Sequence, residues 1–196
     1  MTDKPPAILF DVMDTLVHDP YRQMPQFFGL SWEELAAART PGHWPDFETG
    51  RIDEKSFLDG FFEDRRPYDQ EGFLDIFESG YRWLPGMESI LSELQNLGRE
   101  LHVLSNYPLW YQRIETKLKL SQYLPWTFVS CHTGVRKPAV EAFLGAAETL
   151  GRPPQECLFI DNMSHNCEAA RAVGMDAIVF VDAATLRRAL LERALL

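Results

Sequence analysis

The chain has 196 residues, a formal net charge of -10 at pH 7 and 45% hydrophobic residues. This length and apolar content predict one globular domain with at most a small insertion. The acidic balance argues against nucleic acids and anionic membranes as partners, because both bind basic protein surfaces. The three cysteines have no metal-ligand spacing, and we see neither an apolar leader nor a bilayer-length apolar run. We therefore expect a cytoplasmic protein.

The first predicted element is a short buried strand over residues 7–11, where an apolar run ends on Asp11. Ligands of open parallel α/β sheets bind at the carboxyl edge, which is where this strand would deliver Asp11. Asp11 is therefore a candidate nucleophile or metal ligand. The structural alternative is an aspartate that only caps a turn.

Residues 18–84 differ from the rest of the chain in composition, because they are rich in aromatic residues and contain short helical patterns. A capping box of Ser31 and Glu34 opens one predicted helix, which Pro41, Gly42 and Pro45 break. Further helices are predicted from residue 53 and over residues 70–80. Because no strand pattern appears here, we expect a compact helical insertion.

From residue 85 onward, strand and helix patterns alternate. Strands are predicted over residues 101–104, 127–131, 157–160 and 177–181, and helices over residues 87–97, 109–120, 138–150, 164–173 and from 183. Such alternation predicts a mainly parallel sheet with helices on both faces. The expected fold class is therefore α/β and Rossmann-like, with residues 1–17 and 85–196 as the core domain and residues 18–84 as a separate helical unit.

Polar residues follow several of the predicted strands. They are Asp11, Ser105 with Asn106, Lys137 in the loop after the third strand, and Asp161 with Asn162. Each alone has a structural explanation as a turn former, a helix cap or a solvated side chain. Because parallel strands end at one edge, their joint occurrence favours a shared site.

These residues form four motifs whose order resembles the haloacid dehalogenase superfamily. The motifs are Phe10-Asp11-x-x-x-Thr15-Leu16, Leu104-Ser105-Asn106, Lys137-Pro138 and Phe159-Ile160-Asp161-Asn162. The resemblance covers essentially the whole chain. It implies a Rossmann-like core with a small all-helical cap, which here would be residues 18–84.

The resemblance also implies a mechanism, namely Mg2+-dependent hydrolysis of a phosphate ester through an aspartyl-phosphate at Asp11. The substrate would be a small phosphorylated molecule. Lys137 would offset the negative charge at the reaction centre. The implied phosphate-binding residues are Thr15, Ser105, Asn106 and Lys137. The implied metal ligands are Asp11, the carbonyl of Met13, Asp161 and Asn162.

Two positions depart from the family pattern. Met13 stands where phosphatases of the family carry an aspartate as general acid and base, and a thioether cannot carry a proton. Asp14 is the candidate replacement, provided that a turn redirects its side chain. Asn162 stands where the family usually has an acid, so weaker Mg2+ binding is expected, because an amide adds no negative charge.

The sequence is compatible with three hypotheses of function. The first is a phosphate-ester hydrolase that uses Asp14, water or the substrate as proton donor. The second is a hydrolase of another bond, either of the metal-free dehalogenase type or of the phosphonate type, which needs a cap lysine that only Lys55 could supply. The third is a non-catalytic descendant that binds a phosphorylated ligand or a protein. Substrate identity and oligomeric state are not encoded in any recognisable pattern.

Overall fold

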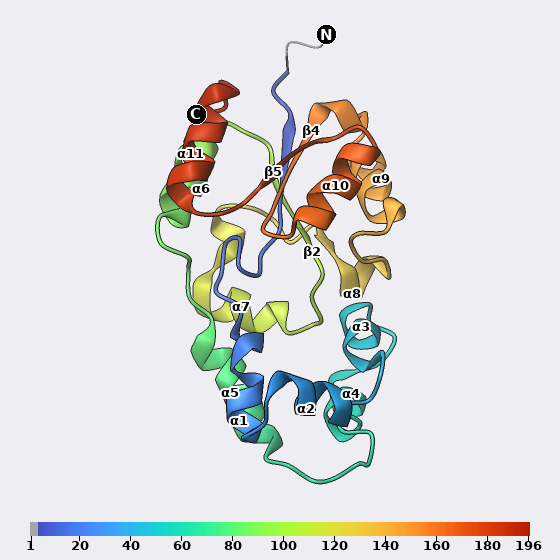
Figure 1. Cartoon of the computed structure of the whole chain (residues 1–196). Coiled ribbons are helices and arrows are strands. Elements are labelled where there is room, and N and C mark those ends of the chain that lie inside the picture. The colour runs from blue at the N-terminus through green and yellow to red at the C-terminus, as the bar shows by residue number, and fades with distance from the viewer. Residues whose placement is uncertain (1–3) are drawn as a thin grey trace.

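The computed structural model describes residues 4–196 and contains one five-stranded sheet (Figure 1). The strands are β1 (Ala7–Phe10), β2 (Leu101–Ser105), β3 (Phe128–Val129), β4 (Cys157–Asp161) and β5 (Asp176–Val179). Their order is β3-β2-β1-β4-β5, and every pairing is parallel. The predicted α/β, Rossmann-like class is confirmed.

Strand β1 occupies the centre of the sheet and is fully buried, with every residue at 0% exposure. Its side chains alternate between the two faces, because successive residues of a strand point in opposite directions. Ile8 and Phe10 pack in the larger hydrophobic cluster, and Ala7 and Leu9 pack in the smaller one. The chain leaving β1 therefore emerges between the ends of β2 and β4.

Helices cover both faces of the sheet, as predicted. One face packs against α6 (Met87–Asn96), α7 (Tyr111–Leu118) and α11 (Ala183–Glu192), and the other packs against α9 (Val140–Thr149) and α10 (Ser164–Ala172). Short turns of helix complete this part of the chain, namely η2 (Leu120–Gln122), α8 (Ser130–Thr133) and η3 (Pro154–Glu156). No helix within residues 4–196 has the length and apolar character needed to cross a bilayer.

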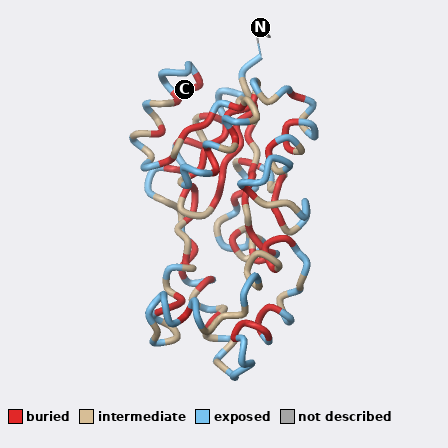
Figure 2. Tube along the Cα trace, turned by 45° about the vertical axis from the view of Figure 1, so that its right-hand side comes forward, coloured by how far each residue is buried: buried red, intermediate tan, exposed pale blue. Residues whose placement is uncertain are grey.

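Residues 18–84, the helical insertion, lie beyond the carboxyl ends of the strands (Figure 1). They form η1 (Pro20–Gln23), α1 (Met24–Phe28), α2 (Trp32–Ala38), α3 (His43–Glu48), α4 (Glu54–Asp59) and α5 (Gln70–Gly80). The Ser31–Glu34 capping box is present at α2. Figure 2 shows buried stretches inside the insertion as well as in the sheet. Its aromatic rings join the larger cluster through Trp110, whose ring centroid lies 4.8 Å from that of Phe77.

One local prediction is wrong. The predicted strand over residues 127–131 stops at Val129, and Ser130 begins α8, because the Ser130 hydroxyl bridges two separate backbone segments. It donates to the carbonyl of Glu48 and accepts from the amide of Tyr107. The helix opened by the capping box ends at Ala38, before Pro41 and Pro45, and Pro45 lies in the first turn of the next helix, α3, where a missing N–H has no intrahelical partner to lose.

Candidate active site

Asp11 is the first residue after β1, and it is held by its neighbours on both sides. Its amide donates to the carbonyl of Ile160 at 2.9 Å, which continues the pairing with β4. Its carboxylate is 7% exposed and accepts three hydrogen bonds. These come from Lys137 Nζ (2.8 Å) and Ser105 Oγ (3.3 Å) on Oδ1, and from Thr15 Oγ1 (3.2 Å) on Oδ2. The ends of the strands therefore meet at Asp11, as the sequence predicts.

Lys137 supplies the positive charge of the site from a buried position. Its Nζ lies 2.8 Å from Asp11 Oδ1, 2.7 Å from Asp161 Oδ2 and 2.8 Å from the carbonyl oxygen of Leu104. An ammonium has three donors, so all of them are used. If the side chain swung away, three buried acceptors would each lose a hydrogen bond and two carboxylates would lose their counter-ion, which fixes the cation beside Asp11.

The charges of this cluster alter one another's proton affinity. Burial raises the pKa of Asp11 to about 6, while the Lys137 ammonium acts in the opposite direction. Burial alone would lower the pKa of Lys137, but the carboxylates of Asp11 and Asp161 outweigh it and raise that pKa. Lys137 is therefore a permanent cation, and Asp11 is a carboxylate at neutral pH with more basicity than an exposed aspartate.

Asp161 closes the cluster from the end of β4. The residue is fully buried, and Oδ1 accepts from the amide of Met163 at 2.7 Å. Oδ2 accepts from Lys137 and from Asn166 Nδ2 at 3.0 Å. Both oxygens are therefore already engaged by protein groups. The hydroxyl of Thr15 ties this strand to β1, since it also accepts from the amide of Asn162 at 3.1 Å.

Asn106 contacts the backbone of Lys137 instead of the carboxylates. Its Nδ2 donates to the Lys137 carbonyl at 2.9 Å, and its Oδ1 accepts from the Lys137 amide at 2.8 Å. The side chain thus holds the loop that delivers Lys137. Its predicted role in binding phosphate stays a prediction.

A cavity of about 200 Å³ opens above the carboxylate of Asp11. It is lined by Asp11, Met13, Asp14, Asp19, Arg22, Asn106, Lys137, Asp161, Asn162, Met163 and Asn166. All the residues predicted to bind metal lie on its wall. Sequence reasoning missed Asp19 and Arg22, because the Asp-Pro pair at positions 19 and 20 has the pattern of an ordinary helix start.

Asp14 reaches this cavity because its backbone is left-handed, with φ of 54°. The turn directs its carboxylate toward the start of the insertion. Oδ1 accepts from the amide of Asp19 at 3.0 Å, and Oδ2 accepts from Arg22 Nε and Nη2 at 2.9 and 2.6 Å. Asp14 is therefore in the pocket but ion-paired, and its predicted part in proton transfer stays a prediction.

The cavity offers oxygen donors of the kind that Mg2+ prefers. Asp11 and Asn162 present carboxylate and amide oxygens, and Asn166 Oδ1 is a buried acceptor with no hydrogen-bond partner in the described chain. No group of three or more His, Cys, Asp or Glu side chains suited to a metal occurs within residues 4–196. The donor set thus fits an oxygen-liganded cation held by few charges.

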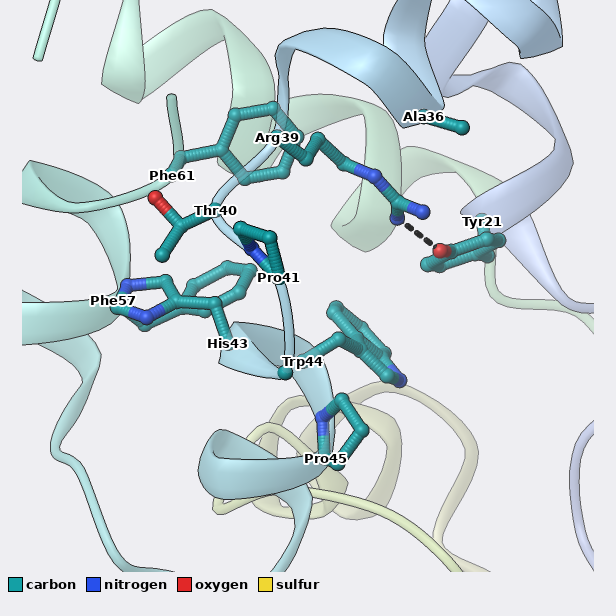
Figure 3. Close-up of a pocket in the computed structure, with 11 residues that line it drawn as sticks. Tyr21, Ala36, Arg39, Thr40, Pro41, His43, Trp44, Pro45, Phe57 and Phe61 are labelled. Atoms are coloured by element: carbon teal, nitrogen blue, oxygen red, sulfur yellow. Dashed lines mark hydrogen bonds between the residues drawn. The ribbon is translucent and has the colours of Figure 1, made fainter. Parts of the chain in front are cut away.

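A second cavity, also of about 200 Å³, lies within the helical insertion (Figure 3). Its walls are largely aromatic and include Tyr21, Trp44, Phe57 and Phe61. The rings of Tyr21 and Trp44 have centroids 4.9 Å apart, and the Arg39 guanidinium donates to the Tyr21 hydroxyl. Because Tyr21 and Arg22 are neighbours in η1, this aromatic cavity adjoins the segment that lines the cavity of Asp11.

A parallel α/β sheet with an aspartate, a lysine and a second aspartate at its carboxyl edge defines a class of hydrolases. The chain belongs to the haloacid dehalogenase-like hydrolase family, whose family model matches residues 5–174. It is 44% identical to flavin mononucleotide hydrolase 1, chloroplastic, of Arabidopsis thaliana, over 94% of this chain and 76% of the relative. Since the name of that relative states a plastid location, a cytoplasmic location for this chain stays a prediction.

Solved structures show the same fold. A haloacid dehalogenase family enzyme of Bacteroides thetaiotaomicron, in complex with magnesium and inorganic phosphate, has a TM-score of 0.74 at 20% identity, covering 91% of this chain and 96% of that one. A dehalogenase structure has a TM-score of 0.64 at 19% identity, covering 90% and 85%. Both likenesses are below 25% identity and therefore show the shared fold alone, so the chemistry must be argued from the site.

Proposed function

We propose that this hydrolase cleaves phosphate monoesters through an aspartyl-phosphate formed on Asp11. The observation that carries the proposal is the buried Asp11 carboxylate, 2.8 Å from a lysine cation and facing a polar cavity. A carboxylate and a phosphate repel each other unless positive charge lies beside them. Lys137 supplies that charge permanently, because two buried carboxylates hold its proton.

Asp11 would attack the phosphorus, and the groups around it would hold its carboxylate in a fixed orientation. The hydroxyls of Thr15 and Ser105 donate to its two oxygens and fix the plane of the carboxylate. Lys137 would lower the energy of the transition state, in which negative charge spreads over the phosphoryl oxygens. Ser105 and Thr15 would contact the phosphoryl group as it approaches Asp11.

Mg2+ would be held by Asp11, the Met13 carbonyl, Asn162 and Asp161, and when bound it would reduce the repulsion between carboxylate and phosphate. Both Asp161 oxygens already accept hydrogen bonds, so its contribution would require one of these bonds to give way. Asn162 adds no charge. We therefore expect Mg2+ to bind weakly and activity to depend on added Mg2+.

The aromatic cavity of the insertion supports a substrate with a planar aromatic part. We propose that residues 18–84 act as a cap whose aromatic cavity holds the leaving group of the ester. Flavin mononucleotide is the first substrate to test, because a relative with 44% identity is named for its hydrolysis. Its ring system would contact Tyr21 and Trp44, while its phosphate would reach Asp11.

The test is phosphate release from flavin mononucleotide, fructose 1-phosphate and p-nitrophenyl phosphate, with Mg2+ and after chelation. Turnover should disappear in Asp11→Asn and persist in Asp46→Asn, a half-buried aspartate on α3 that lines neither cavity. Release that survives in Asp11→Asn would contradict the proposal. Absence of release in the wild type, together with measurable phosphate binding, would favour a non-catalytic phosphate-binding protein.

A separate measurement tests whether the aromatic cavity binds the leaving group of the ester. Tyr21→Leu should raise KM for flavin mononucleotide about tenfold and leave KM for a small alkyl phosphate unchanged, because only the aromatic ester would contact this ring. Tyr123→Leu, outside both cavities, is the control. Equal effects on both esters would show that Tyr21 only supports the fold.

A further inference from the structure

We propose that Asp19 is the catalytic acid and base of this site and performs the proton transfers that Met13 cannot. The inference rests on the proposed phosphate-ester hydrolysis and adds a residue to it. Asp19 is the only aspartate on the cavity wall, apart from Asp11, Asp14 and Asp161, within the described chain. Each of those three aspartates already accepts hydrogen bonds on both carboxylate oxygens, whereas Asp19 accepts one on Oδ1 alone.

The position of Asp19 leaves one carboxylate oxygen available. Oδ1 accepts from the amide of Tyr21 at 2.9 Å, which makes Asp19 the N-cap of η1. Oδ2 makes no hydrogen bond to any group in residues 4–196. Because Asp19 and Asp11 line the same cavity, a substrate placed against Asp11 would lie beside Asp19.

Asp14, the nearest competitor, lacks such an oxygen. Its Oδ2 accepts two hydrogen bonds from Arg22, and its Oδ1 accepts from the amide of Asp19. Asp14 thus orients the loop that carries Asp19. Removing it would disturb both Arg22 and Asp19, whereas the Asp19 carboxylate holds nothing except the start of η1.

The surroundings of Asp19 suit proton transfer near neutral pH. Burial raises the pKa of Asp19 to about 6, and the negative charges of Asp14 and Asp11 act in the same direction. The amide of Tyr21 and the guanidinium of Arg22 oppose them. The hydroxyls of Tyr81 and Tyr107, which hydrogen-bond to each other at 2.8 Å, also feel the charge of Asp19. Burial raises the pKa of both tyrosines, so they stay protonated and add no charge. A general acid works best when its pKa is close to the working pH.

The proton balance of the two steps is complete with Asp19 alone. In the first step a bond forms between an Asp11 oxygen and phosphorus, the bond from phosphorus to the leaving oxygen breaks, and that oxygen takes the proton of Asp19. In the second step the oxygen of water bonds to phosphorus, its proton goes to Asp19, and the bond from phosphorus to Asp11 breaks. Ester and water have become alcohol and phosphate, and Asp19 is protonated again.

The test compares Asp19→Asn with the wild type on two esters. Asparagine keeps the acceptor that caps η1, so the variant retains the local fold. On an alkyl phosphate such as flavin mononucleotide, kcat should fall by about 10²- to 10⁴-fold, because the alkoxide leaves unprotonated. On p-nitrophenyl phosphate, whose phenolate leaves without a proton, the variant should give a burst of one nitrophenolate per enzyme and then slow turnover. Acid quenching should trap phosphorylated Asp11.

Asp53→Asn is the matched control, because Asp53 caps α4 in the same way and lies outside both cavities. It should leave both esters unaffected. Wild-type kcat on the alkyl ester in Asp19→Asn would overturn the proposal, as would an equal loss on both esters without a burst. A burst in Asp14→Asn but not in Asp19→Asn would assign the role to Asp14 instead. A wild-type protein that releases no phosphate from any ester would refute the hydrolysis itself.

Discussion

Lys137 Nζ lies 2.8 Å from Asp11 Oδ1, although the two residues are 126 positions apart in the chain. The contact joins the central strand to the loop after β3. The same nitrogen lies 2.7 Å from Asp161, so one cation serves two buried carboxylates. Under the proposed mechanism, catalysis would depend on the same contact that neutralises these buried carboxylates, so variants of Lys137 should affect both activity and stability.

Replacing Lys137 by methionine should destabilise the fold and abolish turnover. The two carboxylates would stay buried without a counter-ion, which costs about 3–5 kcal/mol of unfolding free energy at pH 7. The loss should be smaller at pH 5, because the pKa of Asp11, already raised to about 6, would rise further and the group would be neutral. Urea unfolding at both pH values measures it. Lys55→Met, with an exposed ammonium, is the control, and an equal loss there would contradict the prediction.

Thr15→Val should weaken both the carboxylate position and the link between β1 and β4. The hydroxyl donates to Asp11 Oδ2 and accepts from the Asn162 amide, and valine can do neither. We expect a loss of about 1–3 kcal/mol in unfolding free energy, together with about a tenfold lower kcat. Thr116→Val removes a hydroxyl from the exposed face of α7 and should change neither quantity. A full kcat in Thr15→Val would show that Lys137 and Ser105 suffice to orient Asp11.

Glu48 should make stability fall as pH rises. Burial raises the pKa of Glu48 to about 7, although Arg136 and the Trp44 indole lower it. The folded state therefore binds this proton more tightly than the unfolded state, whose value is 4.5. The contribution is complete below pH 4.5 and is lost as pH rises through 7.

The variant Glu48→Gln tests this dependence. Between pH 5 and pH 8 the wild type should lose up to about 3 kcal/mol more unfolding free energy than the variant. Glu71→Gln, on the exposed side of α5, should follow the wild type. If the wild type instead gained stability over this range relative to Glu48→Gln, the ion pair with Arg136 would outweigh burial.

Trp110→Ala should loosen the helical insertion. The indole is 1% exposed, and its centroid lies 5.1 Å from that of Phe47 and 4.8 Å from that of Phe77. A cavity of this size costs about 3–5 kcal/mol. Hydrogen exchange should speed up in α3 and α5 more than in β1 and β4. Trp32→Ala, with a ring 46% exposed, is the control, and uniform exchange changes would contradict the prediction.

The elements with simple patterns could be predicted from the sequence. Strand β1 is an apolar run that Asp11 follows directly, β4 is one that ends on Asp161, and the capping box at Ser31 marks the start of α2. The strand predicted around Ser130 failed, because that hydroxyl bonds to Glu48 and Tyr107, which lie far away in the chain. Local patterns carry no information about such partners.

The sequence by itself determined that Asp11, Ser105, Lys137 and Asp161 share one site, because parallel strands joined by helices must bring their carboxyl ends to one edge. Only the tertiary structure decided which partners the neighbouring acidic side chains contact. A left-handed turn at Asp14 directs its carboxylate to Arg22, and the start of the insertion brings Asp19 to the cavity with one oxygen free. The direction of a side chain after a turn depends on contacts with distant segments, and residue spacing does not encode those contacts.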